Sequence, residues 1–301
     1  MLAASGIDTL IGLLPARFLQ EVRAALVLSA DNAEEIRLRQ GYRPVILAAG
    51  RETECADTAV TYADIDELVV RATKSSVHAY LDSMKDGYIT TDGGHRIGVC
   101  GMTARTEGGI LTFRKISSAC IRIARDPDGI DLAPFSSLLQ PGAYRNTVLI
   151  APPGVGKTTL LRALIRALSQ TGRVSVADEK GEISGITPNG GGFDLGKHTD
   201  VLCGCSKREA CMMLLKNMSP EILALDEITS EEDTQAMLLA LNCGVRLLAT
   251  AHAENVKDFL ARPIYRPLVE ANAVSFVGEI YWCNGKRRYS LKRLERGMLS
   301  A

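Results

Sequence analysis

The stretch from Ala151 to Thr159 reads APPGVGKTT, a set of glycines, a lysine and hydroxyl side chains that suits a polyphosphate. It matches the phosphate-loop pattern G-x-x-x-x-G-K-[ST], except that Ala151 stands where the first glycine is usual. The two glycines let the backbone curl so that several N–H groups face one point. The lysine suits the β- and γ-phosphates of a nucleotide, and the threonine after it offers a hydroxyl to Mg²⁺. The expected nucleotide contacts are Pro153, Gly154, Val155, Gly156, Lys157, Thr158 and Thr159.

The segments on either side of this loop are of opposite type. Thr147–Ile150 is a short apolar run, typical of a strand buried on both faces, and Leu160–Leu168 has helical spacing. A helix that begins near Lys157 adds the positive end of its dipole to the loop. This context disfavours a chance glycine-rich turn. A loop that binds nucleotide without hydrolysing it stays open as an alternative.

A second apolar run, Ile222–Leu225, ends in the carboxylates of Asp226 and Glu227. In P-loop ATPases an acid at this place holds Mg²⁺, usually through water, and an acid nearby polarises the attacking water. We therefore assign Asp226, together with Thr158, to the metal environment and Glu227 to water activation. An aspartate after a strand is also a common helix N-cap, which is the alternative interpretation of Asp226.

Two more polar groups follow predicted strands. The acidic segment Asp178–Glu182 comes after Val174–Ala177, and His252 comes after Val245–Thr250. Because the carboxyl ends of parallel strands meet at one edge of a sheet, we expect both groups near the phosphate loop. At that edge His252 can sense the γ-phosphate by hydrogen bonding, whereas a purely structural histidine is the alternative.

The second half of the chain therefore alternates strands with helices, the latter expected at about 207–217 and 231–242. This order predicts an α/β domain with a parallel sheet covered on both faces. Near the end of the chain, Ile280–Cys283 and Arg288–Leu291 flank Asn284-Gly285, which predicts a hairpin.

The first half of the chain predicts a smaller, mixed α+β domain. We expect helices over about 16–30 and over 64–84, the second with Asp64 as its cap. Turn-rich residues near 125–129 end this part, so the domains expected are 1–135 and 136–301. The predicted strands are Ile36–Arg39, Val45–Leu47, Tyr88–Thr91, Arg96–Val99, Ile110–Arg114 and Ala119–Ala124, with a hairpin turn at Asp92-Gly93-Gly94.

Composition limits the class of partner. The 301 residues carry a formal net charge of +0, so no bulk attraction to nucleic acid or to an acidic membrane is expected. The 8 cysteines stand mostly among small or apolar neighbours, as in a reduced cytosolic protein, and the spacing of Cys203, Cys205 and Cys211 is not that of a zinc site. With no secretory signal or membrane-spanning stretch visible, we expect a cytoplasmic protein.

The order of these motifs resembles the type II and type IV secretion and pilus ATPases, which share a RecA-like P-loop domain. Within that superfamily the chain as a whole resembles the stage III sporulation protein AA family. The likeness covers both expected domains and weakens in the last forty or so residues. It is carried by the phosphate loop and by Asp86–Thr90, Gly93–Gly98, Ile116–Ser118, Ile121–Arg125 and Asp226–Ile228.

The resemblance implies roles that spacing alone does not. Glu182 falls on the acidic-box glutamate of the superfamily, Glu227 on the Walker B glutamate and His252 on the histidine-box residue. Arg114 matches an arginine that reaches the phosphates from the first domain, and Arg122 and Arg125 are further candidates, although solvated strand faces would explain all three. The resemblance also implies a hexamer in the mother-cell cytosol that hydrolyses ATP with Mg²⁺ and acts with membrane proteins of a secretion-like channel during endospore formation.

Two other classes of protein remain as alternatives. P-loop rings also move DNA and RNA, but neutral charge and the lack of an aromatic and basic stripe disfavour a nucleic-acid translocase or loader. A slowly hydrolysing, nucleotide-dependent switch or scaffold would carry the same phosphate loop. The acidic residues and His252 disfavour it without excluding slow turnover.

Overall fold

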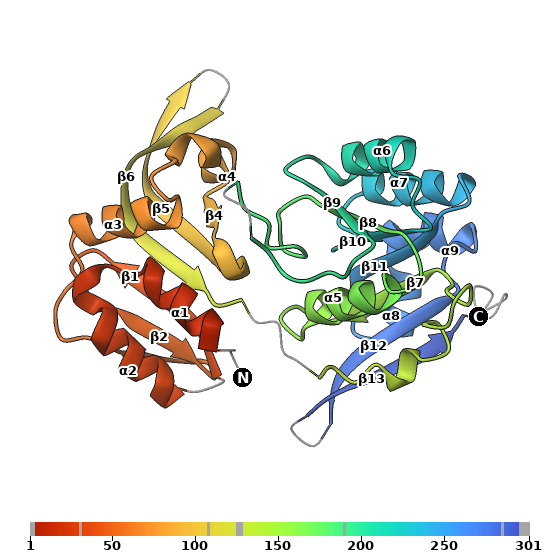
Figure 1. Ribbon diagram of the computed structural model, residues 1–301, viewed down its shortest axis with the longest axis horizontal. Coiled ribbons are helices and arrows are strands. Elements are labelled where there is room, and N and C mark those ends of the chain that lie inside the picture. Colours follow the sequence, from red (N-terminus) through yellow and green to blue (C-terminus); the bar gives the residue numbers. More distant parts are fainter. Residues whose placement is uncertain are drawn as a thin grey trace. The chain divides into compact units, whose positions relative to one another are not determined.

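The computed structural model describes residues 4–29, 32–106, 109–124, 129–188, 191–283 and 286–294 (Figure 1). Its contacts divide the chain into two compact units. The first contains Met1–Pro127 and Gly185–Phe193, and the second contains Asp128–Ser184 and Asp194–Ala301. The chain therefore passes from the first unit to the second, returns for a short segment, and ends in the second.

A six-stranded antiparallel sheet forms the centre of the first unit, in the order β3-β2-β1-β6-β5-β4. Alternate strand residues such as Ile36, Leu38, Ile97 and Ile121 are buried in one apolar core with residues of the helices. This alternation is the pattern of a sheet with one face against a core. The strands are β1 (Ala33–Arg39), β2 (Val45–Ala48), β3 (Arg51–Glu54), β4 (Tyr88–Thr90), β5 (Arg96–Thr106) and β6 (Gly109–Arg122).

The helices of this unit are shorter than the sequence suggests. The expected helix over 64–84 is broken after α3, because Lys74 and Ser75 have positive φ angles of 47° and 64°. Asp64 is not the cap either: Thr61 caps α3, and Asp64 is the third helical residue of the capping box. The helices are α1 (Ala4–Leu13), η1 (Ala16–Phe18), α2 (Leu19–Ser29), α3 (Tyr62–Ala72), η3 (Val77–Tyr80), α4 (Leu81–Lys85) and η4 (Asp92–Gly94).

Two strands that the sequence predicts separately form one continuous strand in the structure. Ile110–Arg114 and Ala119–Arg122 belong to the single strand β6, which pairs with β5 through three register shifts and ends two residues before the predicted end at Ala124. Such bulges let a long hairpin keep pairing while its twist changes, so alternation is lost between the two predicted pieces. The predicted hairpin of β4 and β5 around Asp92–Gly94 is present.

The segment Gly185–Phe193 belongs to the first unit although it follows β8 of the second. The Thr187 hydroxyl donates to Asp92 Oδ1 at 3.1 Å. Gly94 has a φ of 73°, and a Cβ atom there would lie 2.3 Å from Cζ of Phe193. Only glycine therefore allows the Phe193 ring to pack at this turn.

A seven-stranded sheet forms the centre of the second unit, in the order β13-β12-β7-β11-β10-β8-β9. All neighbouring pairs are parallel except β12 with β13, which form the predicted C-terminal hairpin at the edge of this same sheet. Its turn, Asn284-Gly285, lies outside the described residues. The strands are β7 (Thr147–Ala151), β8 (Val174–Asp178), β9 (Thr199–Cys203), β10 (Ile222–Leu225), β11 (Arg246–His252), β12 (Phe276–Cys283) and β13 (Lys286–Arg293).

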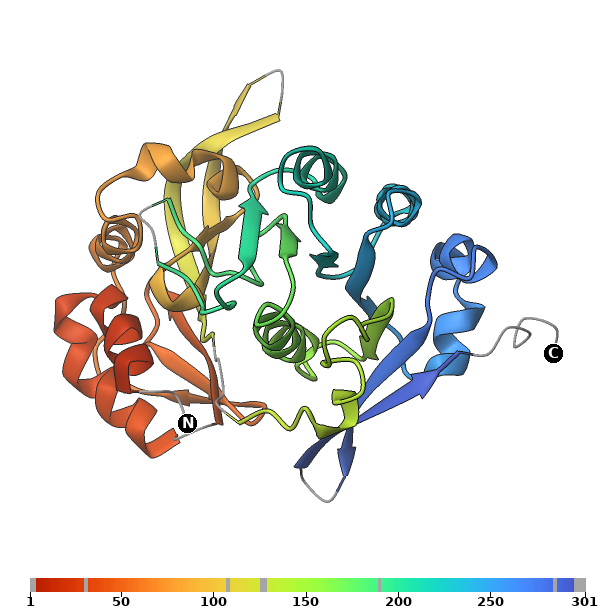
Figure 2. The ribbon, with the colours of Figure 1, turned by 45° about the vertical axis from the view of Figure 1, so that its right-hand side comes forward.

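Helices cover both faces of this sheet. Alternate strand residues such as Val148, Leu223 and Leu247 pack with α6 to α9, and α5 lies on the opposite face (Figure 2). The predicted helices 207–217 and 231–242 are confirmed as α6 and α7. Among the described residues, none of the helices is long and apolar enough to cross a membrane. The helices are η5 (Ala133–Phe135), α5 (Lys157–Leu168), α6 (Lys207–Asn217), α7 (Glu231–Asn242), α8 (Val256–Ala261), η6 (Pro263–Tyr265) and α9 (Arg266–Glu270).

Candidate nucleotide site

The phosphate loop joins the end of β7 to the start of α5, as the sequence predicts, and it turns on two left-handed glycines. Gly154 has a φ of 75° and Gly156 a φ of 108°, values that L side chains rarely adopt. Gly156 is also the N-cap of α5, and a glycine leaves the first N–H groups of the helix open to an anion. The other expected contacts lie along the same turn, namely Pro153, Val155, Lys157, Thr158 and Thr159.

The Lys157 side chain is held inside this turn. Its ammonium donates to the carbonyl oxygens of Ala151 and Pro152, both at 3.1 Å, and lies 3.0 Å from Nδ1 of His252. Burial lowers the pKa of Lys157, while the charges of Glu227 and Asp226 oppose that shift. A buried ammonium held by neutral acceptors favours the arrival of an anion such as a phosphate.

Asp226 lies directly beside Thr158. Its Oδ2 accepts from the Thr158 hydroxyl at 2.7 Å, and its Oδ1 accepts from the Thr250 hydroxyl and from the N–H of Glu227. Burial raises the pKa of Asp226, although the two hydroxyl hydrogen bonds act against this rise. A hydroxyl beside a carboxylate is a pair of oxygen donors that suits Mg²⁺, which takes its other ligands from phosphates and water. Thr158 and Asp226 therefore fit a magnesium ion.

Glu227 has an unusual backbone. Its φ of 46° is in the left-handed region, which costs a residue other than glycine on the order of 1–3 kcal/mol. Its N–H donates to the Thr250 hydroxyl at 2.7 Å, and its carbonyl oxygen accepts from Lys207 Nζ at 2.8 Å. Both backbone groups are thus fixed, and the bend determines where the side chain points.

His252 bridges Glu227 and Lys157. The Oε1 atom of Glu227 lies 3.0 Å from Nε2 of His252, and Nδ1 of the same ring is the atom beside Lys157 Nζ. A lysine ammonium can only donate, so Nδ1 accepts and the proton stays on Nε2, which donates to the glutamate. One neutral tautomer therefore satisfies both neighbours. This lysine–histidine–glutamate chain joins the phosphate loop to the segment that follows β10.

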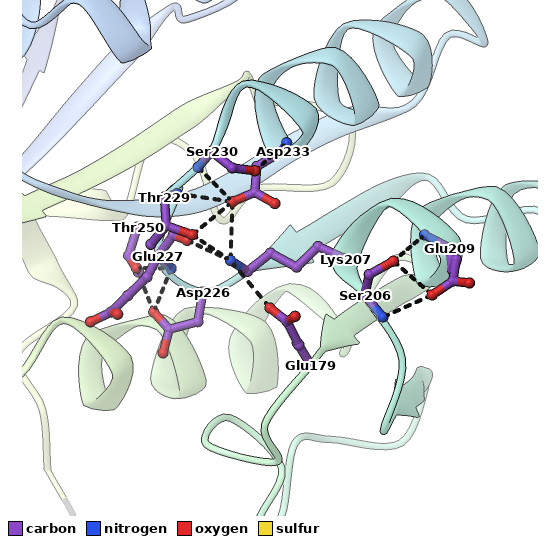
Figure 3. Close-up of polar contacts among 10 residues, drawn as sticks. All are labelled: Glu179, Ser206, Lys207, Glu209, Asp226, Glu227, Thr229, Ser230, Asp233 and Thr250. Atoms are coloured by element: carbon purple, nitrogen blue, oxygen red, sulfur yellow. Dashed lines mark hydrogen bonds and ion pairs between the residues drawn. The ribbon is translucent and has the colours of Figure 1, made fainter. Parts of the chain in front are cut away.

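Lys207 was not predicted, and it is a second centre of contacts (Figure 3). Its side chain is 8% exposed, and its ammonium lies 3.1 Å from Oδ2 of Asp233 and 3.7 Å from Oε2 of Glu179. It also donates to the Glu227 carbonyl, as described above. Because a lysine at the first position of a helix opposes the helix dipole, its place at the start of a predicted helix was the available signal.

Asp233 completes this cluster. Burial opposes its ionisation, but the N–H of Thr229 and the charge of Lys207 outweigh burial and hold the pKa of Asp233 below its ordinary value. The same carboxylate accepts from the N–H groups of Thr229 at 2.9 Å and of Ser230 at 3.2 Å. Asp233 is also part of the capping box that starts α7. Its role in the fold is thus structural.

The acidic segment after β8 divides into two kinds of carboxylate. Asp178 is 2% exposed and accepts from the N–H groups of Ile183 and Ser184, so it holds its own turn. Glu182 is half-buried and lines a pocket together with Asp226 and Glu227. The other residues that line this pocket are Ala177, Asp178, Glu179, Lys180, Lys207 and Thr229.

The predicted arginines lie apart from this cluster in the chain. Arg114 and Arg122 are exposed on β6 of the first unit, and Arg122 Nε lies 3.5 Å from Oε1 of Glu35. Arg125 lies outside the described residues. A contact of any of them with phosphate therefore stays a prediction.

Comparison with known proteins agrees with the resemblance found in the sequence. A family model described as sporulation stage III, protein AA matches residues 8–277. Stage III sporulation protein AA of Bacillus subtilis (strain 168) is 38% identical over 247 residues, which are 80% of this chain and 80% of that protein.

Solved structures share the fold. The pilus retraction motor PilT with bound ADP matches with a TM-score of 0.59 and 17% identity over 93% of this chain and 84% of PilT. The ATPase DotB of Yersinia pseudotuberculosis matches with a TM-score of 0.59 and 17% identity over 91% of this chain and 78% of DotB. At this identity the likeness shows an α/β fold like that of secretion and pilus ATPases. The family match over most of the chain shows that the protein belongs to the stage III sporulation protein AA family.

Proposed function

We propose that this chain is a Mg²⁺-dependent ATPase that powers or gates a secretion-like channel between mother cell and forespore during endospore formation. The observation that carries the proposal is the convergence of Lys157, His252 and Glu227 at the phosphate loop, with Thr158 and Asp226 beside them. These groups come from three neighbouring strand ends and match the needs of phosphoryl transfer. Membership of the sporulation family and the fold shared with PilT and DotB support the cellular role.

In this proposal the loop binds the triphosphate through its backbone N–H groups and Lys157. The lysine turns from the carbonyls of Ala151 and Pro152 to the β- and γ-phosphates, which are stronger acceptors. Thr158 and Asp226 hold Mg²⁺, which when bound neutralises charge on the phosphate oxygens. Because Thr158 and Asp226 already touch, little rearrangement is needed.

Glu227 then orients a water molecule for attack on the γ-phosphorus, with Glu182 as a second carboxylate in the same pocket. His252 loses its lysine partner when Lys157 turns to the nucleotide. The ring can then turn so that its protonated Nε2 donates to the γ-phosphate in place of Glu227, and its position reports whether that phosphate is present. Arg114 is the proposed source of further positive charge.

The covalent path of the chain gives hydrolysis a way to move the first unit. The turn that carries Glu182 continues directly into Gly185–Phe193, which is anchored in the first unit by Thr187 on Asp92 and by Phe193 on Gly94. A change at the acidic turn therefore pulls on the other unit. In a hexamer such motions would pass to membrane proteins of the channel.

Phosphate release from purified protein tests this function. Lys157→Ala should remove nucleotide binding and turnover, whereas Lys197→Ala, an exposed lysine away from the loop, should match the wild type. Glu227→Gln should bind ATP and turn over slowly. Normal hydrolysis by Lys157→Ala would contradict the site, and normal hydrolysis by Glu227→Gln would move water activation to Glu182. Stimulation by single-stranded DNA or RNA would instead favour a nucleic-acid translocase.

A further inference from the structure

The hairpin of β12 and β13 reaches the same edge of the sheet as the phosphate loop. β12 is parallel to β7 and pairs with it up to Glu279 opposite Ile150. The strand then continues through Ile280–Cys283, beyond the last paired residue of β7. Since parallel strands end at one edge, the last residues of β12, Ile280–Cys283, lie at the edge where the loop after β7 begins.

Arg287 of β13 lies against the phosphate loop itself. A Cβ atom on Gly156 would lie 3.1 Å from Nη1 of Arg287 and 3.3 Å from Cζ. The guanidinium therefore stands at contact distance from the glycine whose N–H begins the anion site. A fixed positive charge at this point adds to the field of Lys157 and of the helix N-terminus.

Trp282 stands beside this arginine. It is directly opposite Arg287 in the strand register, and the Arg287 Cζ atom lies 5.4 Å from the centroid of the tryptophan ring. The side chain is 58% exposed, although a tryptophan usually buries most of its large surface. It is also the single tryptophan of the chain.

Trp282 points to the face of the sheet that carries Leu149. Gly278 is four residues earlier on β12 and so shares its face, and a Cβ atom on Gly278 would lie 2.7 Å from Cδ2 of Leu149. Tyr281 points to the other face because successive side chains of a strand alternate. Trp282 and Arg287 thus form one small surface, aromatic and cationic, next to Gly156.

The position of the catalytic groups tells where a nucleotide would lie. Asp226, Glu227 and His252 come from the ends of β10 and β11, which follow β7 on one side, whereas β12 is its neighbour on the other side. The terminal phosphate must face the carboxylates and the histidine. The nucleoside then extends in the opposite direction, toward β12 and β13.

We propose that Trp282 and Arg287 bind the nucleoside end of the nucleotide, with the indole ring stacked on the purine base and the guanidinium on the phosphate nearest the ribose. This inference rests on the proposed binding of ATP at the phosphate loop. Stacking on tryptophan recognises the flat face of a base, so it gives affinity for purines with little choice between them. The arginine adds a charge-assisted hydrogen bond to phosphate.

The single tryptophan makes the test direct. Tryptophan emission is followed while the full chain is titrated with Mg²⁺ and ATP, and separately with Mg²⁺ and inorganic tripolyphosphate, which has no base. We expect a saturable change with ATP and little change with tripolyphosphate. By calorimetry, Trp282→Ala should bind ATP about tenfold more weakly. The affinity of this variant for tripolyphosphate should stay within about twofold of the wild type.

Further variants separate stacking from charge. Trp282→Phe should restore much of the affinity for ATP, and Arg287→Ala should weaken both ATP and tripolyphosphate by about fivefold. Tyr281→Ala and Arg288→Ala are matched controls, since they alter the neighbouring side chains on the opposite face, and both should bind as the wild type does.

The outcomes distinguish this inference from the function on which it rests. Suppose that ATP and tripolyphosphate both bind, but Trp282→Ala leaves the affinity for ATP unchanged and the tryptophan emission of the wild type does not respond to ATP. The nucleoside site is then elsewhere, and ATP binding stands. If neither binds, both proposals fail. An emission that changes with protein concentration and not with ATP would show that a second copy of the chain covers Trp282, which would also overturn the inference.

Discussion

Asp226 and Asp233 are both buried aspartates near the end of β10, and their surroundings are opposite. Asp226 accepts from two hydroxyls and one backbone N–H, all neutral, and has the carboxylates of Glu227 and Asp178 near it. Asp233 accepts from backbone N–H groups and from the ammonium of Lys207. The pKa of Asp226 is accordingly raised by burial, whereas the pKa of Asp233 is lowered.

The difference distinguishes a candidate binding site, around Asp226, from a structural cluster around Asp233 and Lys207, which we call the support. Asp233 has a cation supplied by the chain, so its charge is balanced within the fold. The hydrogen-bond partners of Asp226 are all neutral, so no direct ion pair balances its charge, and a cation that arrives with the substrate would do so. The two clusters meet at Glu227, whose N–H contacts Asp226 and whose carbonyl contacts Lys207. The support thus fixes the backbone of the residue that we propose to activate water.

The largest expected effect is on turnover at the site. Asp226→Asn keeps the shape of the side chain and removes the negative charge that would hold Mg²⁺. We expect ATP hydrolysis to fall about 1,000-fold, on the order of 4 kcal/mol in the barrier. Phosphate release at saturating Mg²⁺ and ATP measures this, with Asp200→Asn on β9 as the matched control. Turnover close to that of the wild type would make Asp226 a structural residue like Asp233.

The next effect is on stability at the support. Asp233→Asn leaves the Lys207 ammonium buried with Glu179 3.7 Å away as its remaining carboxylate. We expect a loss of about 3 kcal/mol in the free energy of unfolding, measured by urea titration. The pKa of Asp233 is lowered in the folded state, so the stabilisation that it provides is present above its ordinary pKa and is lost as pH falls through the folded value. The difference between variant and wild type should shrink in acid, and a constant difference would contradict the ion pair.

Lys207→Met should have a smaller effect, this time on turnover, and it tests whether the support positions Glu227. It removes the donor to the Glu227 carbonyl while the Asp226 side of that residue stays intact. We expect kcat to fall about tenfold, on the order of 1.4 kcal/mol, with the KM for ATP within about twofold. Lys216→Met, an exposed lysine at the end of the same helix, is the control. A rise in KM with unchanged kcat would show that Lys207 does not position Glu227.

Local sequence was sufficient to predict the nucleotide site around Asp226 and insufficient to predict the support around Lys207. The phosphate loop and Asp226 each follow an apolar strand, so a short window of sequence contains both the residue and the reason for its position. Lys207 contacts Glu179, Glu227 and Asp233, which are all distant in the chain. Its role depends on which strands become neighbours, and helical periodicity carries no such information.

Because local patterns do not reveal which segments become neighbours, other features of the fold were not predicted either. β9 is half-buried along its whole length and shows neither a clean apolar run nor alternation, so it was not predicted. Nothing in the residues of Gly185–Phe193 indicates that they pack in the first unit. Arg287 lies beside Gly156 only because β12 pairs with β7, a register that no local pattern reveals.

The smallest effect expected is on the stability of the site, and it has the opposite sign to that of Asp233→Asn. In the Asp226→Asn variant, the new amide can accept from the Thr250 hydroxyl and from the Glu227 N–H, and it can donate to the Thr158 hydroxyl. The substitution should therefore raise the free energy of unfolding of the nucleotide-free protein by about 1 kcal/mol, because it removes an unbalanced buried charge.

The pH dependence of that gain follows from the raised pKa of Asp226. The cost of ionising this carboxylate in the fold is fully present above the raised pKa, falls as pH drops below that value, and is gone below the ordinary pKa. Thermal unfolding without nucleotide, followed as pH is lowered from neutral toward the ordinary aspartate pKa, should show the variant more stable at neutral pH and the stability difference shrinking in acid. With Mg²⁺ and ATP present the order of stability should reverse, since a ligand gives more stability to the protein that binds it more tightly. If Asp226→Asn were instead less stable without nucleotide, the two aspartates would both be structural, and the contrast between site and support would be wrong.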